Sequence, residues 1–222
     1  MTTLLAFDTS AAHCAAALLR DGQIVSRIEE MAKGQAERLM ILLEEVLADN
    51  GVTWADLDGI GVGVGPGNFT GIRISVSAAR GLALGLVKPA IGVSNFEAVT
   101  YGVPNAVACL TAPRNQAYVQ NFVADGDPNP ALVDLTDVTS LPKIPGKADP
   151  RFCGPTAEDV AALYFGGQPS DWNLAIAECT PIEAIARIAA GRLHSTTDRP
   201  APLYVKPPDA APPREQPPLI LP

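Results

Sequence analysis

A glycine-rich loop is the first segment whose residue types could do chemistry. Gly65-Pro66-Gly67-Asn68-Phe69-Thr70-Gly71 follows a short apolar run and precedes a predicted helix. Backbone amides at the start of a helix carry partial positive charge, so a phosphate could bind there. The loop lacks both the Lys-Ser/Thr ending of a P-loop and the three-glycine dinucleotide fingerprint. We therefore favour a structural interpretation, in which the glycines and Pro66 form a tight turn and Thr70 caps the helix.

Asp8 is the second candidate, because it ends an apolar run that reads as a buried strand. In actin- and sugar-kinase-like ATPases an acidic residue at this place faces the metal and phosphates, and a glycine and a hydroxyl residue follow it. Here Asp8-Thr9-Ser10 supplies the acid and the hydroxyls without the glycine. Two interpretations stay open: Asp8 contacts a phosphate, or it caps the turn after the strand.

The sequence offers few residues suited to metal-dependent or nucleophilic catalysis. A catalytic zinc or iron site needs about three converging His, Cys, Asp or Glu ligands. The chain has two histidines, His13 and His194, in different halves, and its four cysteines form no CxxC pair. No GxSxG elbow occurs either. We predict no metal site, no peptidase chemistry, and reduced thiols in a cytoplasm.

The charge balance argues against direct binding of nucleic acid. Sixteen Lys and Arg stand against 24 Asp and Glu, a net charge of −8, and no basic cluster is present. Proteins that bind nucleic acid need a basic face, because counterion release from phosphates supplies most of the affinity. No apolar run reaches the roughly 20 residues of a membrane span, and no secretory signal opens the chain. We expect a cytoplasmic protein that meets RNA only through a partner.

The first half predicts strand–helix–strand units around the loop. Asp21-Gly22 is a two-residue hairpin signal between two of the strands. Crossover connections of this kind indicate a mixed sheet with helices on its faces. We expect strands at 4–9, 14–20, 23–29, 59–65 and 90–93, and helices at 35–49, 71–86 and from Ser94 onward.

Two of these helices carry more apolar and small surface than one sheet should need. In helix 35–49 the apolar positions recur at spacings of three and four. In helix 71–86 the small residues share one side, which lets another helix approach closely. Exposed surfaces of that sort mark interfaces. We assign a partner interface to Leu39, Met40, Leu43, Val46, Gly71, Ser75, Ala78, Ala79, Leu82 and Gly85.

The second half gives weaker patterns. We expect strands at 106–111 and 117–123, a loop from 124 to 150, and helices at 156–164 and 181–193. From Pro200 onward nine of 23 residues are proline, which predicts an extended tail on a surface. We divide the chain into an N-terminal α/β domain, 1–104, with the partner-binding helices, and a smaller C-terminal α/β domain, 105–222, with the proline-rich tail.

Four segments together resemble the TsaB family. The most specific is Gly63 to Arg73, which contains the glycine loop and includes Asn68, Phe69 and Arg73. The first half matches nearly throughout, and the second half matches in patches. The other three segments are 4–10, 36–39 onward, and the C-terminal run 201–210.

The resemblance implies an actin/sugar-kinase-like (ribonuclease H-like) fold of two related domains. It also implies work in forming threonylcarbamoyladenosine beside the anticodon of tRNA. In that system TsaD carries the metal and transfers the group, and TsaE, an ATPase, joins the complex. TsaB is the non-catalytic paralogue that pairs with TsaD through its N-terminal helices. The chain is thus expected to be an accessory subunit without an intrinsic cofactor, with ATP or ADP at the shared interface left open.

The chain departs from the family pattern at two places, and alternatives remain. Gln35 stands where the family often has a histidine, and Thr111-Ala112-Pro113-Arg114 replaces an Asp-Ala-Arg-like stretch. An independent nucleotide-binding enzyme or acyltransferase would use Asp8 and loop 65–71. A glycopeptidase, an older label for relatives, has the least support because of the histidine count. The same helices could also form a homodimer when the partner is absent.

Overall fold

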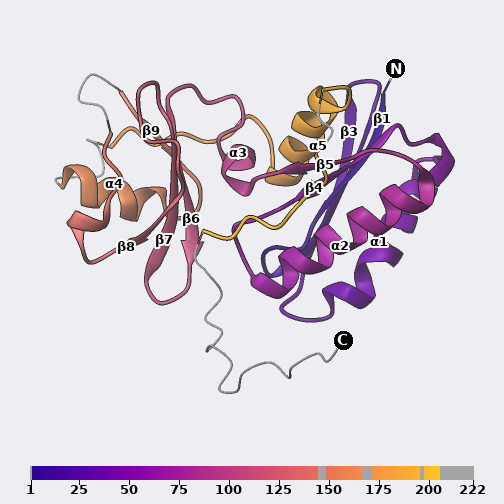
Figure 1. The fold of residues 1–222 in the computed structure, drawn as a ribbon, viewed down its shortest axis with the longest axis horizontal. Helices are drawn as coiled ribbons and strands as arrows, with labels where there is room; N and C mark the ends of the chain where they lie inside the picture. Colours follow the sequence, from indigo (N-terminus) through magenta and orange to yellow (C-terminus); the bar gives the residue numbers. More distant parts are fainter. Residues whose placement is uncertain (1, 145–148, 167–171, 196–197, 206–222) are drawn as a thin grey trace, which may run out of the picture.

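Two sheets lie side by side, each with helices packed against it (Figure 1). The computed structural model describes residues 2–144, 149–166, 172–195 and 198–205. Within these ranges no helix is both long enough and apolar enough to cross a membrane.

The first sheet has the strand order β3-β2-β1-β4-β5. Its first three strands are antiparallel, and β4 and β5 continue parallel to β1. The hairpin turn is the predicted one: Asp21 and Gly22 both have positive φ, at 51° and 85°. The strands are β1 (Thr3–Asp8), β2 (His13–Arg20), β3 (Gln23–Glu30), β4 (Gly59–Gly63) and β5 (Ala90–Val93).

Helices cover both faces of this sheet, and β1 is buried between them. Alternate side chains of a strand point to opposite faces. Leu5 and Phe7 therefore pack with α1 (Gln35–Asp49) and α2 (Phe69–Leu86), which lie on one face. Leu4 and Ala6 pack with α5 (Pro181–Arg192) on the other. Burial on both faces explains why the strand reads as an unbroken apolar run.

The second sheet has the order β8-β7-β6-β9. A short strand and a 3-10 turn lie inside segment 124–150, which we expected to be loop only; the strand pairs antiparallel with β7. The strand has three apolar residues followed by one acid, so it lacks the alternation that predicts a half-buried strand. The elements of this half are α3 (Asn95–Val99), β6 (Ala106–Ala112), β7 (Gln116–Phe122), β8 (Ala131–Asp134), η2 (Val138–Ser140), β9 (Arg151–Cys153) and α4 (Ala157–Phe165); η1 (Trp54–Asp56) precedes β4.

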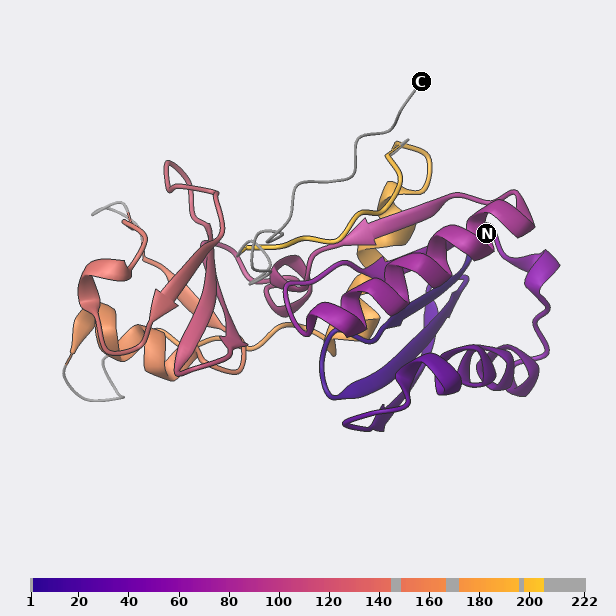
Figure 2. The same ribbon diagram turned by 60° about the horizontal axis from the view of Figure 1, so that its bottom comes forward.

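The end of the described chain returns to the first sheet. Helix α5 contributes Ile182 and Ile185 to the core shared with β1 and β2. The segment 200–205 then runs along β5 towards the second sheet (Figure 2), and the amide of Leu203 donates to the carbonyl of Val64 at 2.8 Å. Sequence order and spatial order therefore differ here. The domain boundary at residue 104 stays a prediction, and α5, which it placed in the second domain, packs on the first sheet.

Helix α2 approaches its own sheet very closely at its first turns. A Cβ added to Gly71 would lie 1.9 Å from the carbonyl oxygen of Thr9. The Thr9 hydroxyl donates to the carbonyl of Gly71 at 2.7 Å, and the Ser75 hydroxyl donates to that of Gly63 at 3.2 Å. Small residues in this helix therefore serve its contact with β1 and β4.

A network of ion pairs ties the edge strand β3 to α1. The guanidinium of Arg38 makes hydrogen bonds of 2.6–2.8 Å to the carboxylates of Glu29 and Glu45. Arg27 bridges Glu45 and Asp49 in the same way. The hydrogen bonds from Arg38 lower the pKa of both Glu29 and Glu45. The register with β2 holds β3 in the sheet, and these ion pairs add a contact between its mostly exposed side chains and α1.

A first prediction concerns the close approach of α2. We expect Gly71→Ala to lower the free energy of unfolding by about 1–3 kcal/mol, because the new methyl group forces the helix away from Thr9. Gly85→Ala is the matched control in the same helix, since a Cβ there meets no atom within 4 Å. It should raise stability by about 0.5–1 kcal/mol. Urea unfolding measures both, and equal effects would contradict the packing argument.

A second prediction concerns the Arg38 network. Glutamates with a lowered pKa stabilise the fold above the ordinary value of 4.5, and that contribution is lost as pH falls through the lower folded pKa. Arg38→Met should therefore destabilise the chain clearly at about pH 7 and much less at about pH 3. Lys33→Met, which alters an exposed cation, is the control. A loss for Arg38→Met that does not change with pH would contradict this role.

Candidate functional site

A cleft between the two sheets is the candidate site. Its larger part, about 540 Å³, lies between the two sheets, and a contiguous smaller part, about 380 Å³, lies between the starts of α1 and α2; the two parts share Ala32, Gln35 and Asn68. The residues that follow β1, β4 and β5 form one wall, among them Ser10, Gly67 and Asn95. The hairpin between β6 and β7 forms the other. Crevices beyond the carboxyl ends of parallel strands are common binding sites in α/β folds.

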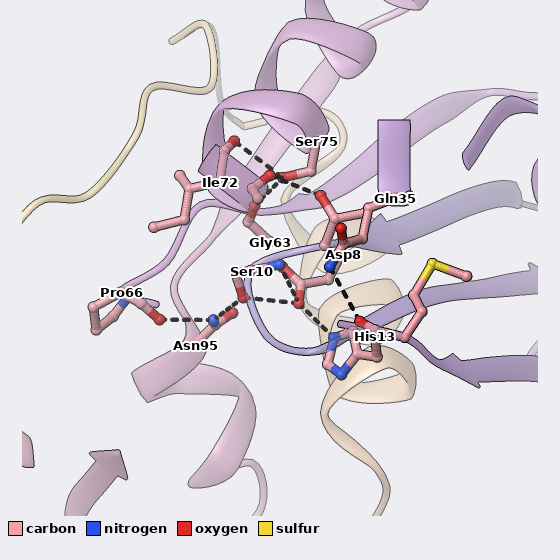
Figure 3. Close-up of polar contacts among 12 residues, drawn as sticks. Asp8, Ser10, His13, Gln35, Gly63, Pro66, Ile72, Ser75 and Asn95 are labelled. Atoms are coloured by element: carbon pink, nitrogen blue, oxygen red, sulfur yellow. Dashed lines mark hydrogen bonds and ion pairs between the residues drawn. The ribbon is translucent and has the colours of Figure 1, made fainter. Parts of the chain in front are cut away.

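Asp8 ends β1 two residues before Ser10 of this wall, and one oxygen of its carboxylate is hydrogen-bonded within the chain. The side chain is only 7% exposed. Its Oδ2 accepts hydrogen bonds from the amide and hydroxyl of Ser10, at 3.2 and 2.8 Å, and from His13 Nε2 at 2.9 Å (Figure 3). Its Oδ1 is buried against Gly63, where a Cβ would lie 2.1 Å away, and accepts no hydrogen bond from the described residues. The hydrogen bond with Asp8 raises the pKa of His13.

Asn95 joins this cluster to the glycine loop. Its Nδ2 donates to the Ser10 hydroxyl at 2.6 Å and to the carbonyl of Pro66 at 3.0 Å (Figure 3). Its backbone amide donates to the carbonyl of Gly65 at 2.8 Å. Three turns, from three different parts of the sequence, are thus fixed to one another. Sequence reasoning missed Asn95, since its only local signal is the capping box that begins α3.

The glycine loop turns towards the chain's own backbone. A Cβ on Gly67 would lie 2.3 Å from the carbonyl oxygen of Ser10. The amide of Asn68 donates to that same oxygen at 2.6 Å. The cap of α2 is Asn68, whose side chain accepts from the amide of Gly71 at 3.0 Å. The assignment of the cap to Thr70 is wrong, and α2 begins two residues earlier than Gly71; Thr70 itself is exposed.

Phe69 and Arg73 bind the C-terminal segment. The rings of Phe69 and Tyr204 stack with their centroids 4.9 Å apart. The guanidinium of Arg73 lies 3.8 Å from the centre of the Phe69 ring, and its Nε donates to the Tyr204 hydroxyl at 3.0 Å. Both side chains, predicted as phosphate contacts or loop residues, are therefore engaged by Tyr204. The part of the C-terminal run from residue 206 on lies outside the described residues.

The larger part of the cleft offers neutral polar groups, whereas Lys33 and Glu37 line the smaller part. Among the described residues that line its larger part, none is Lys, Arg, Asp or Glu. In the ranges that the structure describes, no group of three or more His, Cys, Asp or Glu side chains is placed to hold a metal. Binding a phosphate normally requires Lys, Arg or a metal ion to neutralise its charge. The two departures from the family pattern lie here: Ala112 and Pro113 line the cleft, and Gln35 donates to the carbonyl of Met31 at 3.2 Å.

Six of the predicted interface residues belong to the chain's own core. Their burial follows from the packing of α1 and α2 on the first sheet, because the strongest helical periodicity marks the stripe that faces the sheet. Assigning them to a partner surface was wrong. They are Leu39, Leu43, Val46, Gly71, Ser75 and Ala79.

The other four predicted interface residues lie at or near the surface. Met40 is 38% exposed, Gly85 is exposed, and Ala78 and Leu82 are half-buried. Ile41, which follows Met40 in the sequence, is 52% exposed. The interface role of Met40, Ala78, Leu82 and Gly85 stays a prediction.

Comparisons with known proteins agree with the fold and with the family resemblance. The family model described as TsaD, tRNA N6-adenosine threonylcarbamoyltransferase, matches residues 25–149, more than half of the chain. A solved structure of YeaZ from Pseudomonas aeruginosa is 25% identical with a TM-score of 0.71. It covers 92% of this chain and 100% of that one. The mixed sheets flanked by helices therefore form the expected actin-like α/β fold.

Curated relatives give the same result. Proteins named tRNA threonylcarbamoyladenosine biosynthesis protein TsaB, from Haemophilus influenzae and Escherichia coli, are each 35% identical over 55% of this chain. The chain spans about half the length of these relatives, 55% in both cases. An uncharacterized protein of Mycobacterium tuberculosis is 34% identical over 60% of this chain and 71% of its own length. The chain belongs to the family whose model is described as TsaD, tRNA N6-adenosine threonylcarbamoyltransferase, and it is similar to the proteins named TsaB.

Proposed function

We propose that this chain is a non-catalytic subunit in the formation of threonylcarbamoyladenosine in tRNA, and that it pairs with and activates TsaD in a complex that TsaE joins. One observation carries the proposal beyond family membership. At the position where kinase-like enzymes bind metal and phosphate, one oxygen of the Asp8 carboxylate accepts hydrogen bonds from three donors of its own chain, and the other oxygen is buried against Gly63. The carboxylate of Asp8 stabilises the turns around the cleft. On this proposal the chain contributes to tRNA modification through the surface that binds its partner.

The outer sides of α1 and α2 supply a surface suited to a helical partner. Met40 and Ile41 are exposed on α1, and the half-buried Ala78 and Leu82 lie on α2. A Cβ added at Gly85 would meet no atom within 4 Å, so the surface there is open. Small residues allow a neighbouring helix to approach to the short end of about 8–10 Å between axes. A stable pairing would bury roughly 1,600 Å². On this proposal tRNA meets the chain only within the complex.

The alternative is an independent nucleotide-binding enzyme or acyltransferase that uses Asp8 and loop 65–71. It needs a carboxylate free to bind metal and loop amides free to bind phosphate. The amide of Asn68 and Oδ2 of Asp8 are already bonded within the chain. A nucleotide held at the interface with TsaD would draw part of its site from the partner. The arrangement therefore favours the accessory role over independent catalysis.

A third prediction tests the pairing surface. We expect Gly85→Leu to weaken binding to TsaD at least about tenfold, because the side chain fills the space that a partner helix would occupy. Gly191→Leu is the matched control: it is also an open helical glycine, but on α5 at the opposite face of the sheet. Calorimetric titration with purified TsaD measures affinity, and reconstituted tRNA modification measures function. Undiminished binding by Gly85→Leu would contradict the proposed surface.

A fourth prediction separates the accessory role from the enzyme. Asp8→Asn should lower the free energy of unfolding by about 1–3 kcal/mol, since a buried charged acceptor is lost. Neither the wild type nor this variant, tested alone, should bind magnesium ATP in calorimetry. Glu44→Gln, on an exposed position of α1, should change neither property. Binding of ATP by the wild type that disappears in Asp8→Asn would favour the enzyme.

A further inference from the structure

The C-terminal end of α2 carries two large aliphatic side chains in nearly full contact with solvent. Leu84 is 83% exposed and Val87 is 88% exposed. Val87 is the C-cap of the helix and has φ 55°, in the left-handed region. A β-branched residue is rare there, and glycine is the usual choice. The chain thus places a valine on its surface at a position where glycine would be less strained.

A groove lined by Leu84 and by Lys88, the residue after Val87, runs between the end of α2 and residues 198–200. Its volume is about 660 Å³, and its walls are largely apolar, with Ala83, Leu84 and Pro89 among them. This groove is separate from the pairing surface. Arg80 lies two residues after Ala78, and Leu84 lies two residues after Leu82. In a helix of 3.6 residues per turn, that spacing places the side chains about 160° apart around the axis.

The charge around the groove is opposite to that of the whole chain. Arg80, Lys88 and Arg199 line it together with a single acid, Asp198, whereas the chain carries a net charge of −8. None of the three cations lies within ion-pair distance of a carboxylate in the part of the chain that the structure describes. Unpaired cations that surround exposed aliphatic side chains are complementary to an acidic segment with apolar anchors.

We propose that this groove, which Leu84 lines and which Val87 adjoins next to Lys88 in sequence, docks an acidic amphipathic helix of a partner protein. The apolar face of such a helix would cover the two aliphatic side chains, in the helix-in-groove mode of recognition. Its carboxylates would meet Arg80, Lys88 and Arg199. An RNA backbone would leave the aliphatic side chains uncovered, and three cations neutralise few phosphates. The proposal does not depend on pairing with TsaD, because the other side of α2 serves that contact.

The test uses the full chain and a defined probe. The probe is a synthetic helical peptide of about 16 residues, with leucines spaced three and four apart and glutamates elsewhere. Its matched control carries lysine in place of glutamate. We expect the acidic peptide to cause saturable changes in the amide NMR signals of residues near 80–90 and 198–199, and the lysine peptide to cause none. Raising salt from about 50 to 500 mM should weaken the binding severalfold.

Two variants keep the proposal falsifiable. Val87→Gly removes the aliphatic contact and relieves the left-handed valine, so it should weaken peptide binding about tenfold without lowering the stability of the fold. The double variant Arg80→Glu, Arg199→Glu should lose the acidic peptide and bind the lysine peptide. Unchanged affinity in both variants would overturn the proposal. Three other results would also overturn it. Polyadenylate RNA could shift the same NMR signals more strongly than the acidic peptide, or the signals could shift when the free chain is concentrated without peptide. The third is the absence of binding at about 1 mM peptide.

Discussion

The contact between the turn after β1 and the first turn of α2 constrains the rest of the molecule. The backbone of Thr9 and Ser10 lies so close to Gly67 and Gly71 that neither glycine has room for a side chain. Hydrogen bonds from the Thr9 hydroxyl and the Asn68 amide cross the same contact. Since α2 begins here, this contact sets the direction of the helix. It thereby also sets which of its sides face the sheet, α1 and solvent.

This contact changes the meaning of the glycine loop. Glycines between a strand and a helix serve phosphate sites because backbone amides can then approach a ligand closely. Here the close approach is made to the chain's own carbonyl groups, and the acid at Asp8 is directed to Ser10 and His13. One arrangement of residue types can thus support either catalysis or a rigid scaffold. What decides between them is whether the amides and the carboxylate are already bonded.

Local signals in the sequence predicted the helices and strands well. Contacts between residues far apart in the sequence were not predicted. The hairpin at Asp21-Gly22 and the capping boxes at Ser94 and Thr180 each depend on residues within one turn. The placement of α5 on the first sheet depends on contacts across more than 150 residues, for which no local pattern exists. The same holds for Asn95, whose partners Ser10 and Pro66 are distant in sequence.

The error in the interface has a different cause. Periodicity reports the side of a helix that is most apolar, and in a globular domain that side packs on the domain's own sheet. Leu39, Leu43 and Val46 were therefore found as a stripe and then assigned to a surface that they do not reach. A surface kept for a partner must be less apolar than the core stripe, or the free chain would aggregate.

The outer part of α2 meets this condition by dividing its exposed surface between two flanks. On the flank towards α1, Ala78 and Gly85 keep side chains small, so a partner gains area from close approach of the backbone. On the flank towards residues 198–200, Leu84 and Val87 are large, but cations stand around them. The positive charge repels other cationic surfaces and so restricts this exposed apolar surface to acidic partners. Because α2 is fixed to the turn after β1, both flanks keep one orientation relative to the cleft. A rigid helix can in this way present two different surfaces without either one interfering with the other.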